Sequence, residues 1–440
     1  MCKNLGVLGL GKSGVAAANL AIKLGYNVLA NDPNTVKKRK IKKLNKKVNL
    51  EFSNHSKKIL DSDVIIKSPG IHSDISILKK AVEKKIAIIS ELTFSLKNSK
   101  YKKIIAITGT NGKTTTTDLT AKIIKSFHKE SIVVGNIGTP LSDKALKTKK
   151  NTYIITELSS YQLEDTPNFR PNISVLLNIT PDHLEHHKTM NAYIKAKQNV
   201  FINQRCGDFI ILNYDDRICR RISSKVKANL IYFSKKALIN KGVFYSNGKI
   251  VIKVSKKHFE IEPKINIVGS HNIENILAAT AVSYIAGVNP ENIEKVISKY
   301  KGVEHRIEFV KTVNGSDYYN DSKSTNTDST RVALESFDKN ILIIMGGRDK
   351  GLSYLPLRTL VKDKVKAIFL IGEASNKIRK DLSGVTNFYD CGNIENAVKQ
   401  IYKISVPCDT ILLSPACASF DQFKNFEERG NIFKQLVHKL

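Results

Sequence analysis

The chain has 440 residues, 41% hydrophobic and 25% charged, as expected for a globular protein of two to four domains of roughly 100–200 residues each. No apolar run approaches the ~20 residues that cross a bilayer, and glycines interrupt the short apolar N-terminus, which argues against membrane insertion and a secretory signal. We therefore expect a cytoplasmic protein.

The formal net charge of +31 comes mainly from lysines spread along the whole chain, for example at 36–47, 144–150 and 254–257. Such runs are usually solvated faces, so we expect no specific nucleic-acid partner, although a basic nucleic-acid surface is the alternative. The six cysteines form no C-x-x-C pair, which argues against a disulfide framework or a structural zinc site.

Residues 1–98 alternate strand and helix patterns. Strands are predicted at 5–10, 27–32, 63–70 and 86–90, and helices at 13–25 and 75–85. This alternation predicts a parallel, helix-covered sheet, that is, a Rossmann-like N-terminal domain. The polar stretch 95–103 predicts a linker.

Residues 99–302 show a second α/β pattern. Strands are predicted at 103–109, 131–135, 152–158, 173–179 and 209–213, and helices at 117–127, 271–287 and 289–300. The segment 230–254 predicts hairpins, with a tight turn at Ser-Asn-Gly-Lys. We expect a central, mainly parallel domain of the P-loop ATPase type.

Residues 303–440 carry a third pattern. Strands are predicted at 341–347, 367–372 and 410–416, and helices at 329–337, 393–402 and 428–440. The expected fold class is therefore α/β throughout, with a Rossmann-like C-terminal domain as the third unit.

A first glycine-rich turn follows strand 5–10. Gly9, Gly11 and Gly14 fit G-x-G-x-x-G, and Asp32 lies about 20 residues onward. The pattern suits a dehydrogenase, but its physical content is only that backbone can approach a diphosphate at a helix N-terminus. Any nucleotide diphosphate would fit, including a UDP-sugar.

A second turn, Ile-Thr-Gly-Thr-Asn-Gly-Lys-Thr, follows strand 103–109. Gly112, Lys113 and Thr114 match the end of G-x-x-x-x-G-K-[ST], while Ile107 replaces the first glycine. Backbone N–H groups would cradle phosphate, Lys113 would reach the outer phosphates, and the Thr114 hydroxyl would bind Mg²⁺. The alternative is a turn that only caps a helix.

Two further strand ends carry possible metal ligands. Glu157 ends a predicted strand, where a carboxylate would hold Mg²⁺ or would simply cap a helix. His183 follows predicted strand 173–179 in a His-rich stretch. A zinc cluster there is conceivable, but the H-E-x-x-H spacing is absent, so only His183 is kept as a candidate ligand.

Polar loops of the third region are also candidates. Asp321 would accept a hydrogen bond from a ribose hydroxyl or an amine, and Lys323 would neutralise a phosphate or carboxylate. The loop 413–430 combines hydroxyls with two aromatics that look buried, Phe420 and Phe426. Physics alone does not name its ligand.

Six stretches together resemble the Mur ligases, the ATP-dependent amide-forming enzymes of peptidoglycan synthesis. They span nearly the whole chain in the family's order, at 109–116, 157–163, 178–187, 269–275, 305–306 and 320–326. The stretch 413–430 looks like the member that adds D-glutamate. The resemblance implies transfer of the γ-phosphoryl group of ATP to the carboxylate of UDP-N-acetylmuramoyl-L-alanine, followed by attack of the D-glutamate amine on the acyl phosphate.

The resemblance also implies residue roles. ATP would be bound by Gly109, Thr110, Asn111, Gly112, Lys113, Thr114, Thr115, Thr116, Asn272, Asn275, Arg306 and Asp321. The UDP-substrate would contact Ser13, Asn34, Gly70 and Asn136. D-glutamate would contact Thr325, Lys350, Ser419, Phe420 and Phe426, together with Lys323. The catalytic set would be Lys113, Glu157, His183, Lys197, His305 and Lys323.

Two Mg²⁺ sites are implied, the first held by Thr114 and Glu157 and the second by His183, with Lys197 as a carbamate. We expect a monomer that acts on small molecules. Three alternatives remain: a Mur-type or folylpolyglutamate-type ligase with another acceptor, a basic nucleic-acid-binding NTPase, and a dehydrogenase.

Overall fold

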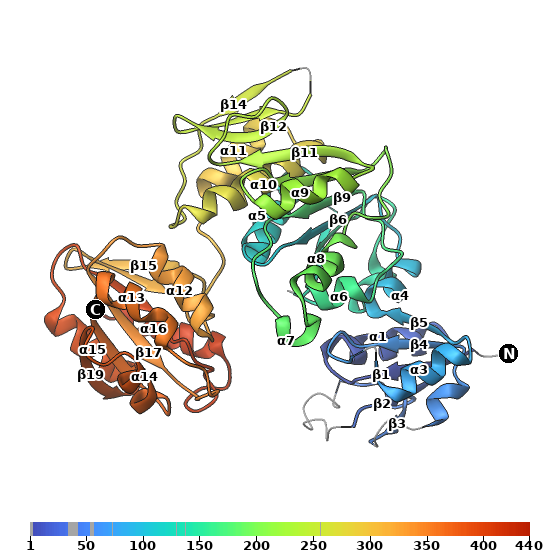
Figure 1. The fold of residues 1–440 in the computed structure, drawn as a ribbon, viewed down its shortest axis with the longest axis horizontal. Coiled ribbons are helices and arrows are strands. Elements are labelled where there is room, and N and C mark those ends of the chain that lie inside the picture. Colours follow the sequence, from blue (N-terminus) through green and yellow to red (C-terminus); the bar gives the residue numbers. More distant parts are fainter. Residues whose placement is uncertain are drawn as a thin grey trace. The chain divides into compact units, whose positions relative to one another are not determined.

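The computed structural model describes residues 3–33, 43–52, 57–72, 74–128, 130–136, 138–255 and 257–440 (Figure 1). Its strands form three sheets flanked by helices. The chain divides into two compact units, Met1–Pro263 with Ile273–Ile297, and Lys264–Asn272 with Ser298–Leu440. The first two sheets belong to the first unit and the third sheet to the second.

The N-terminal sheet is entirely parallel. Its strands are β1 (Asn4–Leu8), β2 (Asn27–Asn31), β3 (Asn49–Glu51), β4 (Val64–Lys67) and β5 (Ala87–Ser90). Its helices are α1 (Lys12–Lys23), α3 (Ser76–Glu83) and α4 (Glu91–Lys97), with a 3-10 helix, η1 (Lys57–Asp61). The order β3-β2-β1-β4-β5 is the Rossmann order 3-2-1-4-5-6 without its sixth strand.

Helices cover both faces of this sheet. Alternate residues of a strand face opposite sides. Val7 therefore packs in the core with α1 and α4, while Leu8 packs with η1 and α3. The predicted linker 95–103 is partly wrong, because helix α4 runs on to Lys97, capped by the Ser90 hydroxyl and anchored by buried Phe94.

The central sheet has nine strands, coloured cyan to yellow in Figure 1. They are β6 (Lys103–Thr108), β7 (Ser131–Gly135), β8 (Tyr153–Glu157), β9 (Ile173–Leu176), β10 (Phe209–Asn213), β11 (Asn229–Ser234), β12 (Gly242–Ser246), β13 (Lys249–Lys253) and β14 (Phe259–Ile261). The order is β14-β13-β12-β11-β10-β9-β6-β8-β7, parallel from β7 to β12 and antiparallel beyond.

The helices of this region are α5 (Lys113–Phe127), α6 (Ser160–Glu164), α7 (Leu184–His187), α8 (Met190–Gln198), α9 (Arg217–Ile222), α10 (His271–Ile285) and α11 (Pro290–Lys299), with 3-10 turns η2 (Leu141–Asp143), η3 (Ala145–Lys147) and η4 (Ser223–Lys225). Helix α5 begins four residues before its predicted start at 117, directly at the glycine-rich turn. Helices α6 and α8 bury Leu163 and Tyr193 against Ala106 of β6.

The predicted hairpins at 230–254 are only partly right. Strands β12 and β13 do form a hairpin, joined by Asn247 and Gly248, which both have positive φ. Strands β11 and β12, however, are parallel, with Tyr232 opposite Gly242. The segment between β11 and β12 therefore brings the chain back to the end of the sheet where β11 began. Turn residues alone do not specify such a parallel pairing.

The C-terminal sheet has six strands: β15 (Glu308–Val313), β16 (Ser316–Asn320), β17 (Ile341–Gly346), β18 (Val365–Ile371), β19 (Asn387–Gly392) and β20 (Thr410–Leu413). Its helices are α12 (Thr327–Glu335), α13 (Arg358–Lys364), α14 (Ser375–Asp381), α15 (Ile394–Ile404) and α16 (Phe426–His438), with one 3-10 turn, η5 (Leu355–Leu357). The order is β15-β16-β20-β17-β18-β19, with only β15 antiparallel to its neighbour.

This third sheet also has helices on both faces. Ile343 packs with α12, α13 and α14, whereas the next residue, Ile344, packs with α15 and α16. The predicted α/β class with three mainly parallel sheets is confirmed, and the domain limits at 98/99 and 302/303 stay predictions. Among the described residues, no helix is both long and apolar enough to cross a membrane.

Candidate active site

The glycine-rich turn between β6 and α5 depends on two glycines with positive φ. Gly112, with φ +81°, caps α5, and a Cβ there would lie 2.1 Å from Asn275 Oδ1. Gly109 has φ +158°, and its Cβ would lie 2.9 Å from Leu177 Cβ. Side chains would therefore both strain and obstruct this turn, which carries backbone N–H groups at a helix N-terminus.

The turn is held by its neighbours. The N–H of Thr110 donates to Asn178 O at 3.0 Å, and the N–H of Asn111 donates to Asn178 Oδ1 at 2.8 Å. The Thr110 hydroxyl lies 3.0 Å from the Tyr193 hydroxyl of α8. These contacts fix the backbone of the predicted phosphate loop against the neighbouring elements.

The first turn of α5 packs against α10. The Thr116 hydroxyl donates to Asn275 Oδ1 at 3.2 Å, in the same unit. Thr114 and Thr115 are buried directly after the turn. Asn275 therefore contacts the helix whose N-terminus the loop presents.

Two lysines meet at one carbonyl of the loop. Lys113 Nζ donates to Gly109 O at 3.0 Å and to Thr110 O at 2.8 Å, and Lys197 Nζ donates to Gly109 O at 2.8 Å. Lys197 is 1% exposed. Burial, reinforced by the charge of Lys113, holds the pKa of Lys197 well below its ordinary value. Its ammonium also lies 4.8 Å from the centre of the Tyr193 ring.

Glu157, the last residue of β8, is a buried carboxylate with one satisfied oxygen. Asn136 Nδ2 donates to Oε1 at 2.7 Å. The other oxygen, Oε2, is buried without a hydrogen-bond partner among the described residues. Leaving such an oxygen unpaired is costly, and a hard divalent cation is the partner that carboxylates at phosphate sites take.

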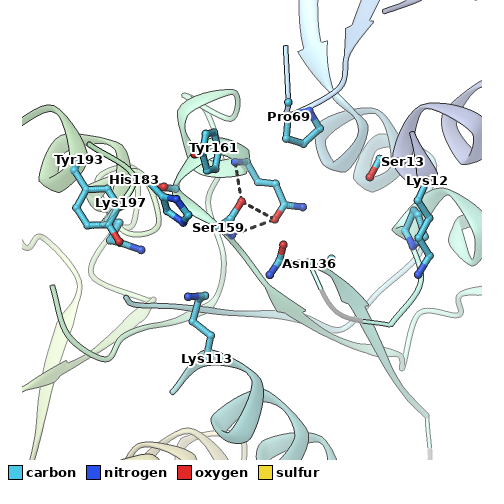
Figure 2. A pocket seen from close by; sticks show the side chains of 15 residues that line it. Lys12, Ser13, Pro69, Lys113, Asn136, Ser159, Tyr161, His183, Tyr193 and Lys197 are labelled. Carbon is cyan, nitrogen blue, oxygen red and sulfur yellow. Dashed lines mark hydrogen bonds between the residues drawn. The ribbon is translucent and has the colours of Figure 1, made fainter. Parts of the chain in front are cut away.

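A cavity of about 520 Å³ is lined by several of these groups, namely Lys113, Asn136, Tyr193 and Lys197, but not by Glu157 (Figure 2). Its lining comes from both sheets of the first unit: Lys12, Ser13, Pro69, Gly70, Lys113, Gly135, Asn136, Pro140, Ser159, Ser160, Tyr161, Gln162, His183, Tyr193 and Lys197. In Figure 2, Lys113 and Asn136 point into this space, with His183 on one side and Ser13 on the other.

A second cavity, of about 530 Å³, lies at the first glycine-rich turn. It is lined by Gly9, Gly11, Lys12, Ser13, Asp32, Pro33, Ser68, Pro69, Gly70, Ile71, His72 and Ile75. The Asp32 carboxylate accepts a hydrogen bond from the Leu10 N–H at 2.7 Å and so holds the turn. Lys12 Nζ donates to Gly138 O. Asn34 lies outside the described residues.

His183 lies in an irregular segment. Strand β9, which precedes it, ends at Leu176, three residues before the predicted end at 179, and the chain then bonds with the phosphate loop before it reaches His183. His183 has φ +54° and precedes α7. Its ring nitrogens lie 3.3 Å from Asp182 Oδ2 and 3.6 Å from Glu185 Oε1.

The neighbouring histidines already have partners. His186 Nε2 lies 2.8 Å from Glu164 Oε2, and His187 Nε2 lies 2.9 Å from the Ser160 hydroxyl. The ligating atoms of Glu164, His186 and His187 lie within 4.8 Å of one another. Both Nε2 atoms take part in these hydrogen bonds.

In the second unit, Asp321 is a buried acid at the end of β16. It accepts from the Ser414 hydroxyl at 2.7 Å and from the Ile307 N–H at 3.3 Å. Burial raises the pKa of Asp321 to about 6, and hydrogen bonds from Ser324 and Ser414, followed by the attraction of Arg306, only partly offset this rise. Asn272 belongs to the same unit.

His305 is held by a polar network. Its backbone N–H donates to Glu308 Oε2 at 2.8 Å, and its Nδ1 lies 2.9 Å from Asn320 Nδ2. The ring is 4% exposed, and burial lowers its pKa. The Lys323 N–H donates to His305 O at 3.0 Å, which connects this network to the polar loop.

The predicted amino-acid contacts lie on neighbouring loops of this sheet. Lys350 Nζ donates to Thr325 O at 3.3 Å, and Ser419 is buried. Phe426 begins α16 and lies edge-on to His305, with ring centres 6.1 Å apart. The expectation that Phe420 is buried is wrong, because it is 65% exposed. The sequence shows that Phe420 is apolar, but it does not show that the loop places this side chain in solvent.

Comparisons with known proteins agree with this arrangement. Three family models match in order: the Mur ligase MurD-like N-terminal domain over residues 3–90, the Mur ligase middle domain over 107–283, and the Mur ligase glutamate ligase domain over 305–417. The chain belongs to the Mur ligase family.

Similar curated proteins of the family are named UDP-N-acetylmuramoylalanine–D-glutamate ligase. The protein of Koribacter versatilis is 42% identical over 100% of this chain and 98% of its own. That of Elusimicrobium minutum is 43% identical over 99% of this chain and 97% of its own. Among solved structures, UDP-N-acetylmuramate-alanine ligase from Thermotoga maritima has a TM-score of 0.61 at 19% identity, covering 100% of both chains, which supports the fold.

In this Mur ligase, the predicted phosphate loop, Glu157, Asn136 and Lys197 lie together in one unit. The residues that sequence reasoning missed are mainly those that hold these groups. Tyr193 lies one helical turn before Lys197, and this i, i+4 spacing was the available signal. Asn178, which binds two residues of the loop, begins the family-like stretch 178–187, but that resemblance did not predict its role.

Proposed function

We propose that this Mur ligase joins D-glutamate to UDP-N-acetylmuramoyl-L-alanine, with conversion of ATP to ADP and phosphate. The observation that carries the proposal is the set of groups at the glycine-rich turn. Lys113 and Lys197 both donate to Gly109 O. The buried Glu157 pairs with Ile107, on the strand that leads into the turn. The names of the relatives point to D-glutamate as the acceptor.

The reaction has two balanced steps. The alanyl carboxylate of the UDP-substrate attacks the γ-phosphorus of ATP, and ADP leaves. The amine of D-glutamate then attacks the acyl carbon of the acyl phosphate, an amide bond forms, and phosphate leaves with loss of a proton from nitrogen. Lys113 would stabilise the negative charge of the transferring phosphoryl group, because positive charge fixed in a buried site acts strongly there.

The residues at the loop fit Mg²⁺. The unpaired Glu157 oxygen supplies a hard anionic ligand, and the Thr114 hydroxyl lies on the adjoining helix turn. Bound Mg²⁺ would neutralise phosphate charge. Asn136 would keep the Glu157 carboxylate in place through their 2.7 Å hydrogen bond. A second ion at His183 is part of the proposal, supported by its place in the cavity lining.

Lys197 would act as a carbamate. Only a neutral amine adds CO₂, and the lowered pKa of Lys197 favours that form. The carbamate would place an anion beside the Lys113 ammonium, since both lysines lie at Gly109 O. The two charges would then attract each other.

The other substrates would lie at the remaining polar loops. Ser13, Gly70 and Asn136, in the cavity lining, would contact the UDP-substrate. In the second unit, Lys323, Thr325, Lys350 and Ser419 would bind the two carboxylates of D-glutamate, Phe426 would wall the site, and Phe420 would contact the amino acid. Asn272, Arg306 and Asp321 would contact ATP, and His305 would hold the loop of Lys323. We expect the protein to act in the cytoplasm as a monomer.

The test is phosphate release from ATP in the presence of UDP-N-acetylmuramoyl-L-alanine, with D-glutamate, L-glutamate, L-lysine and meso-diaminopimelate offered separately. We expect release only with D-glutamate. A preference for a diamino acid would reject the proposed acceptor and leave a Mur-type ligase. Phosphate release that requires nucleic acid, or oxidation of a hydroxy acid with NAD, would reject the ligase itself.

A further inference from the structure

Arg429, on the first turns of α16, has a fully buried side chain, at 0% exposure. Its guanidinium group makes four hydrogen bonds. Nε donates to the Ser322 hydroxyl at 2.9 Å, and Nη2 donates to Ser322 O at 2.8 Å. Nη1 and Nη2 both donate to Cys417 O, at 3.2 and 3.1 Å. One side chain therefore joins the loop after β16 to the loop after β20.

The charge of this arginine is not neutralised by direct contact. In the described part of the chain, no carboxylate lies within 4.0 Å of its nitrogens, and Asp421 and Asp321 attract it only from farther away. Burial lowers the pKa of Arg429 to about 10, so the group stays charged at neutral pH. A buried cation without a paired carboxylate is costly, and an apolar side chain would fill the space at lower cost.

The two residues that Arg429 binds, Ser322 and Cys417, each lie a few residues before a proposed acceptor contact in the same loop. Ser322 precedes Thr325 by three residues, and Cys417 precedes Ser419 by two. The Ser322 hydroxyl also donates to the carbonyl of Phe426, one turn before Arg429, at 2.8 Å.

A third loop passes close to the guanidinium group without a hydrogen bond to it that the described residues show. A Cβ added to Gly347 would lie 3.3 Å from Arg429 Nη1, and Gly347 precedes Lys350 by three residues. The guanidinium group therefore binds the segments that lead to Thr325 and Ser419, on the helix that Phe426 begins, and lies near the segment that leads to Lys350.

We propose that Arg429 is the positioning residue of the amino-acid acceptor site, where its planar donor fork ties two loops together beside a third and its buried charge favours an acceptor with carboxylates. This inference rests on the proposed function. Lysine carries the same charge but is a compact point donor and does not reproduce the fork. The two contributions are therefore separable by substitution.

The test compares Arg429→Lys, which keeps the charge, with Arg429→Met, which removes both charge and fork. We expect Arg429→Met to raise KM for D-glutamate at least about tenfold, the scale of one lost hydrogen bond to a charged group, with KM for ATP within about twofold. Arg429→Lys should fall between this variant and the wild type. Arg331→Met, at an exposed arginine paired with Glu335 on α12, is the matched control and should leave both constants unchanged.

A purely structural role would lower the thermal unfolding midpoint and kcat without raising KM for D-glutamate, and that outcome would overturn the proposal. Arg429→Lys keeps the test decisive if Arg429→Met does not fold. The wild type is assayed first. If it uses another amino acid, the proposed function fails, and the Arg429 variants are then scored on KM for that acceptor, where an unchanged KM overturns the positioning role separately.

Discussion

Replacing Gly112 with alanine tests the glycine-rich turn directly. A non-glycine residue in the left-handed region costs roughly 1–2 kcal/mol, and Gly112 has φ +81°. The new Cβ would also lie 2.1 Å from Asn275 Oδ1, so Asn275 must move and lose its 3.2 Å bond with Thr116. That bond is worth about 1 kcal/mol. We therefore expect Gly112→Ala to destabilise its unit by about 2–3 kcal/mol.

The same change should weaken ATP binding. The helix N-terminus reaches phosphate only through this turn, so an altered turn misplaces its N–H groups. We expect KM for ATP to rise at least about tenfold, the scale of one misplaced hydrogen-bond donor. The assay is initial-rate kinetics with ATP varied, together with urea unfolding.

Gly25→Ala is the matched control. Gly25 has φ +83°, but its Cβ would meet nothing within 4 Å. It should show the backbone cost alone, about 1–2 kcal/mol, with KM for ATP unchanged. The double variant Gly112→Ala with Asn275→Ala should be more stable than Gly112→Ala alone, because the Asn275 Oδ1 atom that the new Cβ would meet is no longer present. A Gly112→Ala protein with wild-type stability and KM for ATP would refute this account of the turn.

The remaining predictions concern four polar side chains. Lys113→Ala should lower turnover roughly a hundredfold, the scale of losing one fixed electrostatic donor, and near-normal turnover in a folded variant would exclude its role. Lys197→Ala should be nearly inactive and partly restored by short-chain carboxylates; full activity without them would contradict the carbamate. Ser419→Ala should raise KM for D-glutamate more than KM for ATP in initial-rate assays, and the reverse order would remove Ser419 from the acceptor site. The pKa of Asp321 rises from 3.8 to about 6 on folding, so the folded state binds this proton more tightly than the unfolded state does. The ionised carboxylate therefore destabilises the fold increasingly as pH rises from 4 to 7, by at most about 3 kcal/mol. The stability of Asp321→Asn relative to the wild type should therefore improve over that range in urea unfolding, and a flat difference would contradict the shift.

Local patterns were enough to predict much of the fold and the kind of site. Predicted strands 131–135 and 209–213 coincide with β7 and β10, because short apolar runs bounded by polar residues have few other solutions. The loop ending in Gly112 and Lys113 was recognisable because its glycine spacing is set by backbone conformation within a few residues. The family resemblance rested on the same short motifs, in order along the chain.

Only the tertiary structure determined which of these residues meet. Lys197 is 88 residues from Gly109, and their hydrogen bond exists because α8 packs on the sheet beside β6. Glu157 accepts a hydrogen bond at Oε1 from Asn136, 21 residues away, while its Oε2 is buried with no partner among the described residues. Arg429 carries no local sign of burial, since its environment comes from loops 12 and 107 residues away. Contacts of this kind depend on strand order and helix packing. Because the interactions that determine these are spread over the whole domain, no short sequence segment predicts them.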